Sequence, residues 1–349
     1  MKATRFLVTL LAAALAAGAA LPARADDSAR PWYADAAALL VPGAFHHAAT
    51  AKAAPSRVGQ ARLMRMKGVQ LMNGLSKAPV GTTSAPQLQY FGGPLLGQVK
   101  VQLVYWNSQV SHQDKLPGFF SSIVKSPYFS WLKEYSTGSQ TIRKGSYLGA
   151  YTDAVKAPAS AQIEDADIRA ELSKRIADKS LPQPDANTLY MVYFPPGLNV
   201  DLDGQGSCQV FCAYHNTFTA GGREVNYGVI PDQGGSCAGG CGGAASEFDN
   251  ETSVSSHEMI EAVTDPAVGL VTGNNPQAPM GWYDANYGEI GDICNAVQAK
   301  VGAYTVQREW SNSRGLCVAS ASDPGAPVSM MSTVAGASSA PKTAAATTR

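Results

Sequence analysis

Short stretches that alternate apolar and polar residues mark the strands in the middle of this chain. Residues 98–106 alternate in this way, which is the two-residue period of a half-buried strand. Two denser apolar runs, 187–194 and 225–230, each end at a proline and predict two further strands.

Helical spacing of apolar residues marks the segments between and after these strands. Residues 116–135 show it irregularly, and residues 161–177 form an amphipathic pattern. A further helix is expected over 252–264, where Pro266 prevents its continuation. Because helices and strands mix without a regular βαβ repeat, we expect an α+β fold.

The first 25 residues resemble an export signal. Lys2 and Arg5 precede an apolar stretch over 6–21, and Ala23-Arg24-Ala25 supplies the small residues that signal peptidase requires. No later segment approaches the ~20 apolar residues of a membrane-spanning helix. We therefore expect residues 1–25 to be removed and the protein to be secreted or periplasmic, without a membrane partner.

The next segment and the other end of the chain differ from the middle. Residues 26–85 offer one helix, Pro31–Leu40, and predict a linker or a propeptide, with an ordinary N-terminal extension as an equal alternative. Residues 319–349 consist mainly of Ser, Ala, Thr, Pro and Gly with few large apolar residues, and predict a disordered tail. One monomeric domain over 86–318 remains.

Charge and composition narrow the class of protein. Twenty-seven basic residues balance twenty-seven acidic ones, and no basic cluster occurs, so nucleic acid is not expected as a partner. Thirty-four glycines and twenty-one prolines indicate a loop-rich fold.

Six cysteines lie between residues 208 and 317, and an even number in an exported chain favours disulfides over a thiolate zinc site. Sequence alone does not choose among their connectivities. The expectation is three local bridges, which are Cys208–Cys212, Cys237–Cys241 and Cys294–Cys317.

The segment His257-Glu258-Met259-Ile260-Glu261 carries the candidate chemistry. His257 and Glu261 are four residues apart, so on a helix they share one face and can bind one ion. Glu258 lies beside them, where it can reach a metal-bound water as a general base. The usual zinc-peptidase pattern has His in place of Glu261, but zinc also accepts a carboxylate at ~2.0–2.2 Å.

A third ligand is expected downstream, because catalytic zinc takes three protein ligands and one water. Glu289 has the distance for this role, with Asp292 placed to orient His257 as a supporting group. Asp265 is an alternative ligand, although Asp before Pro at a helix end usually serves the turn. Calcium is possible as an additional or alternative ion, but His257 favours zinc. A lone histidine near the cysteines, His215, is expected to be structural.

Several motifs together resemble the EXORDIUM/phosphate-induced proteins of plant cell walls. They span roughly residues 86–318, and the cysteine spacing is their most specific part. They are Tyr90-Phe91-Gly92-Gly93-Pro94, the strand to Trp106, Cys208 to His215, Cys237 to Cys241, Val263-Thr264-Asp265-Pro266, Cys294 and Cys317. The resemblance implies the fold, the disulfides and export. By itself it does not imply catalysis.

Two functions of different classes follow. The first is a secreted zinc metallopeptidase with a zincin-like mixed sheet and an active-site helix, acting on protein or peptide substrates. Zinc would lower the pKa of its bound water toward ~7, and Glu258 would transfer that water's proton to the leaving amine. The alternative is a non-catalytic extracellular or wall-associated protein in which the metal serves structure.

Overall fold

The computed structural model describes residues 62–65, 85–158, 160–244, 246–267 and 280–328. The chain divides after residue 53, and every described residue belongs to the unit that follows. The predicted signal peptide, the expected helix Pro31–Leu40 and residues 329–349 of the expected tail lie outside the described residues.

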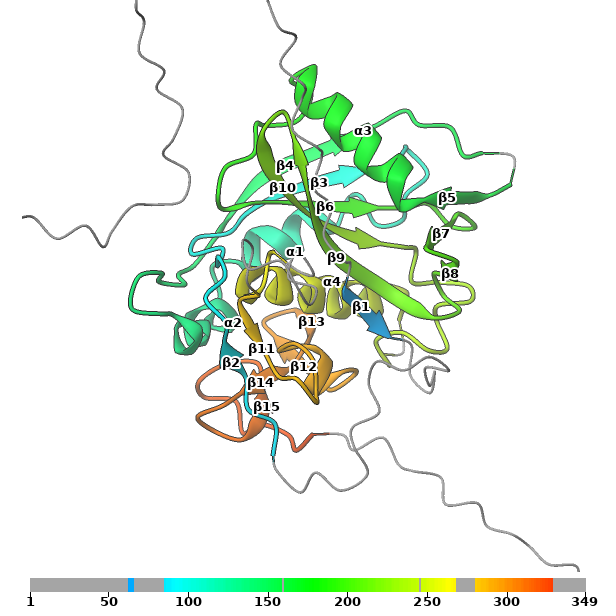
Figure 1. The fold of residues 1–349 in the computed structure, drawn as a ribbon. Coiled ribbons are helices and arrows are strands. Elements are labelled where there is room, and N and C mark those ends of the chain that lie inside the picture. The colour runs from blue at the N-terminus through cyan, green and yellow to red at the C-terminus, as the bar shows by residue number, and fades with distance from the viewer. Residues whose placement is uncertain (1–61, 66–84, 159, 245, 268–279, 329–349) are drawn as a thin grey trace, which may run out of the picture. The chain divides into compact units, whose positions relative to one another are not determined.

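A six-stranded mixed sheet forms the centre of the described part, in the order β1-β9-β10-β6-β3-β4 (Figure 1). Five of the six strands run in the same direction, and β9 runs antiparallel to both of its neighbours. The sheet strands are β1 (Arg62–Arg65), β3 (Lys100–Tyr105), β4 (Ser146–Thr152), β6 (Thr188–Tyr193), β9 (Phe211–Ala220) and β10 (Arg223–Ile230). The fold is therefore a mixture of helices and strands around one mixed sheet.

Helices cover both faces of this sheet. Figure 1 shows α3 on one side and α1 and α4 on the other. The helices are α1 (Leu116–Ile123), α2 (Pro127–Ser130), η1 (Trp131–Tyr135), α3 (Asp165–Ala177), α4 (Glu247–Thr264) and η2 (Asp292–Cys294). The helical pattern expected over 116–135 is thus divided among three short helices, because Ser126 caps a new helix that begins at Pro127.

Short strands complete the fold, and several of them lie after α4. They form small ladders of two or three strands apart from the main sheet. These strands are β2 (Gln89–Tyr90), β5 (Gln162–Glu164), β7 (Asn199–Leu202), β8 (Gln205–Gly206), β11 (Trp282–Tyr283), β12 (Gln298–Val301), β13 (Tyr304–Gln307), β14 (Glu309–Ser311) and β15 (Leu316–Val318).

Helix α4 lies between the main sheet, at β9 and β10, and strand β13 on the other side. It begins at Glu247, earlier than expected, because the Ser246 side chain accepts a hydrogen bond from the Asp249 amide. Every residue from Asn250 to Thr264 is buried. Since a helix that is buried all round belongs to the core, its charged residues must find their partners inside the protein.

The expected strands over 98–106, 187–194 and 225–230 are present as β3, β6 and β10. The ten-residue strand β9 was not predicted. Its first eight residues are all buried, polar and apolar alike, so the sequence lacks the alternation that identifies a strand. Strand β1 was also not predicted, and it lies in the segment expected to be a linker or propeptide.

The described fold continues past residue 318. Arg308 forms a two-pronged ion pair with Asp323, with N–O distances of 2.9 and 3.1 Å. The main chains of Cys317 and Ala326 exchange hydrogen bonds of 2.8 and 2.9 Å. The expectation that disorder begins at residue 319 is therefore wrong for residues 319–328.

The three disulfides join Cys208 to Cys237, Cys212 to Cys241, and Cys294 to Cys317. The last pair was expected, whereas the local bridges 208–212 and 237–241 were wrong. Cys237 and Cys241 lie in one tight turn, where the Cys241 amide donates to the Cys237 carbonyl at 2.9 Å. This turn presents both sulfurs to the segment at the start of β9, so two adjacent bridges form between the segments.

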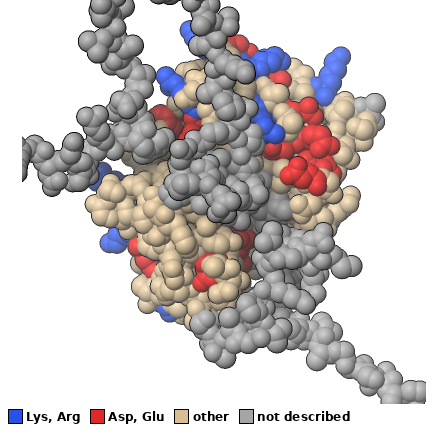
Figure 2. Space-filling model, in the orientation of Figure 1, with Lys and Arg blue, Asp and Glu red and all other residues tan. Residues whose placement is uncertain are grey.

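The charged residues on the surface agree with the balanced charge of the sequence. The face in Figure 2 carries both Lys or Arg and Asp or Glu side chains, with large areas of neither. In the described part of the chain, no helix has the length and apolar character needed to cross a membrane. The three disulfides are of the kind found in proteins outside the cytoplasm.

Peptide mapping of the non-reduced protein distinguishes the observed disulfides from the local ones. Cleavage after Phe211 and after Ala238 separates the cysteines of each close pair, so the Cys208–Cys237 and Cys212–Cys241 links should appear as two distinct cross-linked species. The Cys294–Cys317 peptide belongs to both arrangements and serves as the internal control. Recovery of a Cys208–Cys212 link, or of stoichiometric free thiol, would contradict the structure.

Candidate metal centre

The buried face of α4 brings its acidic residues together with side chains from two distant segments. His257, Glu258 and Glu261 are completely buried. Strand β9 contributes His215, which is 1% exposed, and the segment before η2 contributes Glu289, which is completely buried. These five residues, His215, His257, Glu258, Glu261 and Glu289, form a polar cluster inside the core, where each charge requires a partner.

His215 lies among three carboxyl groups. Its Nδ1 is 3.2 Å from Glu258 Oε2 and 3.6 Å from Glu261 Oε2. Its Nε2 is 3.6 Å from Glu289 Oε1. The sequence predicted a structural role near the cysteines, and sequence reasoning missed its position in this cluster. The only signal that could have found it was a strand assignment for β9, because that strand passes beside α4.

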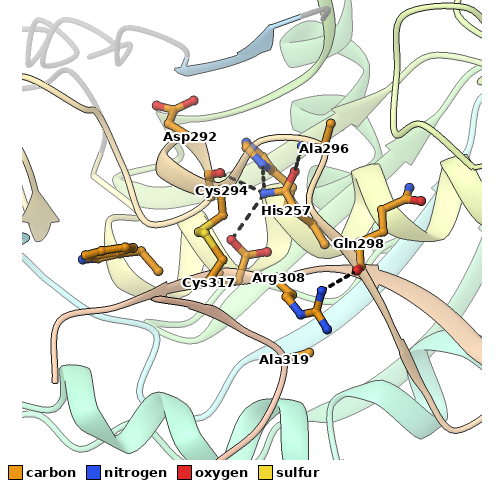
Figure 3. The surroundings of a disulfide bond; sticks show 12 residues. His257, Asp292, Cys294, Ala296, Gln298, Arg308, Cys317 and Ala319 are labelled. Carbon is orange, nitrogen blue, oxygen red and sulfur yellow. Dashed lines mark hydrogen bonds between the residues drawn. A yellow bond between two sulfur atoms is a disulfide. The ribbon is translucent and has the colours of Figure 1, made fainter. Parts of the chain in front are cut away.

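His257 contacts the other oxygen of Glu261. The distance from His257 Nε2 to Glu261 Oε1 is 3.2 Å. The same oxygen accepts a hydrogen bond of 2.9 Å from the Asp292 amide. Figure 3 shows His257 and Asp292 beside the Cys294–Cys317 disulfide. Glu261 thus lies between the two histidines and is held by the main chain of η2.

The partner of His257 Nδ1 is Gln307 rather than the expected Asp292. The Gln307 Nε2 atom lies 2.7 Å from His257 Nδ1 and donates to the Gly291 carbonyl at 2.9 Å. The Gln307 Oε1 atom accepts from the Ala296 amide at 3.1 Å. With the amide in this orientation, Gln307 donates to Nδ1 of a neutral His257 ring, which then carries its proton on Nε2.

The pKa shifts in the cluster follow from burial and from neighbouring charges. Burial, with the charges of Glu261 and Asp292, raises the pKa of Glu258 well above its usual value. Burial alone would raise the pKa of Glu261, but the positive charge of His257 outweighs it and lowers this pKa. Burial alone would lower the pKa of His257, but the charge of Glu261 outweighs it and raises the pKa well above its usual value.

Acidic groups outnumber basic ones in the cluster, which is the arrangement that suits a cation. The carboxyls of Glu258, Glu261 and Glu289 and the backbone-bonded Asp292 surround only two imidazoles. Two carboxyl oxygens of the cluster, Glu258 Oε1 and Glu261 Oε2, are buried without a hydrogen-bond partner among the described residues. A bound ion would supply what these atoms lack.

Two groups of three residues could each hold an ion, with their ligand atoms within 4.8 Å of one another. One group is His215, Glu258 and Glu261, and the other is His257, Glu261 and Asp292. Glu261 belongs to both. In the described part of the chain neither group includes Glu289, the predicted third ligand, which instead lies beside His215.

Asp265, the alternative third ligand, belongs to neither group among the described residues. Its Oδ1 accepts a hydrogen bond of 2.8 Å from the Gly281 amide. The residue ends α4 and fastens the returning chain to the helix, as expected for Asp before Pro.

Comparison of this protein with models of known protein families, with curated proteins and with solved structures found no match. The resemblance to the EXORDIUM/phosphate-induced proteins therefore stays a prediction. What the site can do must be argued from its own residues.

Gly291 packs so closely against the cluster that any side chain there should disturb it. A Cβ atom at Gly291 would lie 2.6 Å from His257 Nδ1 and 2.8 Å from Glu261 Oε1. Gly291→Ala should therefore lower stability by ~1–3 kcal/mol through overpacking and reduce the bound metal. Thermal unfolding and metal analysis of the purified variant measure both effects.

The matched control is Gly239→Ala, because a Cβ atom at Gly239 would meet nothing within 4 Å. This variant should unfold at the wild-type temperature and bind the same amount of metal. Equal behaviour of the two variants would contradict the close packing at Gly291.

Proposed function

We propose that the protein is an exported zinc-dependent peptidase with its ion held by His257, Glu261 and Asp292. The observation that carries the proposal is the pair His257 Nε2 and Glu261 Oε1, two buried atoms on one helix face only 3.2 Å apart. Ligands of one tetrahedral zinc lie about 3.3 Å apart, given bonds of ~2.0–2.2 Å. Asp292 completes a group whose ligand atoms lie within 4.8 Å.

The shape of the fold agrees with this proposal. A mixed sheet with the antiparallel strand β9 beside α4 is the arrangement expected of a zincin-like domain, and we include that assignment in the proposal. Bound zinc would supply a water of lowered pKa and a Lewis acid for the substrate carbonyl. The remaining work falls to residues of this chain.

Glu258 is the proposed general base. Its Oε2 contacts His215 Nδ1 at 3.2 Å, which fixes the carboxyl, and its Oε1 has no hydrogen-bond partner within the described residues. Burial raises the pKa of Glu258, so its carboxylate binds a proton more readily than an exposed one. Glu258 would therefore take the proton of the attacking water and return it to the amine that leaves.

A second function, an extracellular protein with a structural metal, is favoured by one observation. The side chains of His257, Glu258, Glu261 and Glu289 are all completely buried, whereas a catalytic site must admit its substrate. The two functions differ in what happens when Glu258 alone is changed.

Glu258→Gln keeps the size of the side chain and removes its basic oxygen. The variant should fold, keep its zinc and lose peptide hydrolysis by ~10²–10⁴-fold. Glu261→Gln should lose both metal and activity, because an amide oxygen is a weaker zinc ligand. Metal analysis and an assay on an unfolded protein substrate give the two readouts. Full activity in Glu258→Gln would refute the mechanism, and loss of its zinc would make Glu258 a ligand.

Zinc binding should change the tautomer of His257. Gln307 places the proton of the metal-free ring on Nε2, but a ring that binds zinc through Nε2 must carry its proton on Nδ1. At a pH above the raised pKa of His257, we expect the ¹⁵N NMR signals of its imidazole to report an Nε2–H form without metal and an Nδ1–H form with zinc. The switch requires the Gln307 amide to present its oxygen to the ring.

The matched variants are His257→Ala and His215→Ala. The first should lose zinc, and the second should keep it with reduced activity, since Glu258 loses the contact that holds it. An unchanged tautomer, together with zinc loss only in His215→Ala, would place the ion on His215, Glu258 and Glu261 instead.

A further inference from the structure

Strand β1 comes from a part of the sequence far from the rest of the sheet, yet it pairs with β9 directly beside the cluster. It runs antiparallel to β9, with Arg62 opposite His215 and Met64 opposite Ala213. The register shifts between Met64 and Arg65, so the ladder is irregular where β1 ends. A short extended segment therefore lies along the edge of β9, next to a histidine of the candidate site.

The middle of this segment also reaches the proposed general base. A main-chain hydrogen bond from Met64 contributes to the environment of the Glu258 carboxyl. The Met64 side chain is 1% exposed and belongs to the hydrophobic core. A bound peptide would show the same three features as β1. Its main chain would contact the proposed general base, one apolar side chain would be buried, and it would pair antiparallel to β9.

We propose that the edge of β9 beside the cluster is a binding surface for extended polypeptides, and that residues 62–65 occupy it as an internal inhibitor. Addition of a strand to a sheet edge is a general mode of peptide recognition, in which main-chain hydrogen bonds give affinity and side-chain positions give specificity. The proposal deepens the proposed peptidase function, and as a statement about inhibition it rests on that function.

The inference also accounts for the burial of the site. While β1 lies on β9, its Met64 contacts Glu258 and an incoming peptide has no place along this edge. A segment tethered to the same chain competes at high effective concentration, in the millimolar range for short flexible connections. A substrate must therefore displace β1, or β1 must be removed, before a second peptide can bind.

The substrate class follows from the position of Met64. A peptide lying as β1 does would place an apolar side chain in the position of Met64 and the main chain of that residue at Glu258. Hydrolysis there would break the C–N bond that precedes this residue, with water adding its hydroxyl to the carbonyl carbon and its proton, through Glu258, to the amine. We therefore expect unfolded polypeptides with a bulky apolar residue after the cleaved bond.

The test uses the full chain without zinc, so that binding is measured apart from catalysis. Met64→Asp should release β1, because a charge replaces a buried apolar side chain, and Met64→Pro should release it by removing the main-chain N–H. Met72→Asp makes the same change outside β1 and is the matched control. The probe is a fluorescent peptide with the sequence of residues 60–68, followed by anisotropy, with hydrogen exchange of residues 211–219 as the second readout.

The wild type and Met72→Asp should bind the peptide weakly, whereas Met64→Asp and Met64→Pro should bind it at least ~10-fold more tightly, in proportion to the competition removed. The same two variants should exchange the amides of β9 faster while still unfolding in one cooperative transition. Variants that fold but do not bind more tightly would overturn the proposal. So would variants that unfold, because β1 would then be an ordinary structural strand.

Activity separates this inference from the proposed function. With zinc restored, Met64→Asp should cleave an unfolded substrate faster than the wild type. If it binds the peptide more tightly but no variant cleaves anything, the peptidase function fails and the binding surface stands. If the wild type and Met64→Asp cleave at equal rates and bind peptide equally, the surface proposal fails and the peptidase function stands.

Discussion

The buried carboxyl of Glu261 is the group on which the rest of the site depends. One oxygen accepts from the Asp292 amide and lies 3.2 Å from His257, and the other lies 3.6 Å from His215. A charge removed from water is costly unless several partners surround it, so each neighbour must be held in place by something else. The partners of Glu261 come from α4, β9 and η2, which are distant in sequence. Much of the folded core therefore serves to bring these three elements together.

The orientation of His257 extends this dependence into the second half of the domain. Gln307 contacts the ring of His257, and the Gln307 carbonyl accepts a hydrogen bond of 2.8 Å from the buried hydroxyl of Tyr128. The Tyr128 hydroxyl also lies 2.7 Å from Glu309 Oε1. Burial raises the pKa of Glu309 well above its usual value. A continuous polar path thus connects α2 with the candidate metal centre.

The disulfides are placed at the segments that carry the site. Two of them fasten the start of β9, which bears His215, to the turn that precedes α4. The third fastens η2, whose amide holds Glu261, to β15. Loops are more mobile than helices and strands, so a loop alone would position a side chain of the cluster poorly. A disulfide stabilises the folded loop because it restricts the conformations that the unfolded chain can adopt. The segments that bear His215 and Asp292 are therefore each cross-linked to another part of the fold.

The sequence predicted features that depend on residues close together in the chain, and it did not predict contacts between distant segments. The spacing of His257 and Glu261 is a property of one helix, and their placement on one face was expected from sequence alone. His215 and Gln307 reach the cluster through sheet pairing and through β13, and nothing within a few residues of either indicates it. The same limit applied to the disulfides, since neighbours in sequence were preferred over neighbours in space. Strand β1 shows the limit most clearly, because a segment with the composition of a linker lies against the buried Glu258.

That placement bears on what the burial of the cluster means. If the acidic cluster stayed buried at all times, its oxygens without hydrogen-bond partners would not stabilise the fold. A protein with hydrophobic residues of similar volume in their place would be at least as stable. A cluster covered by a short edge strand is different, because four residues in an irregular ladder are a small barrier to displacement. Met64 is buried in the core and the main chain of β1 pairs with β9, while β9 and α4 have partners of their own apart from β1. The burial of Glu258 and Glu261 is therefore compatible with chemistry that begins when β1 leaves.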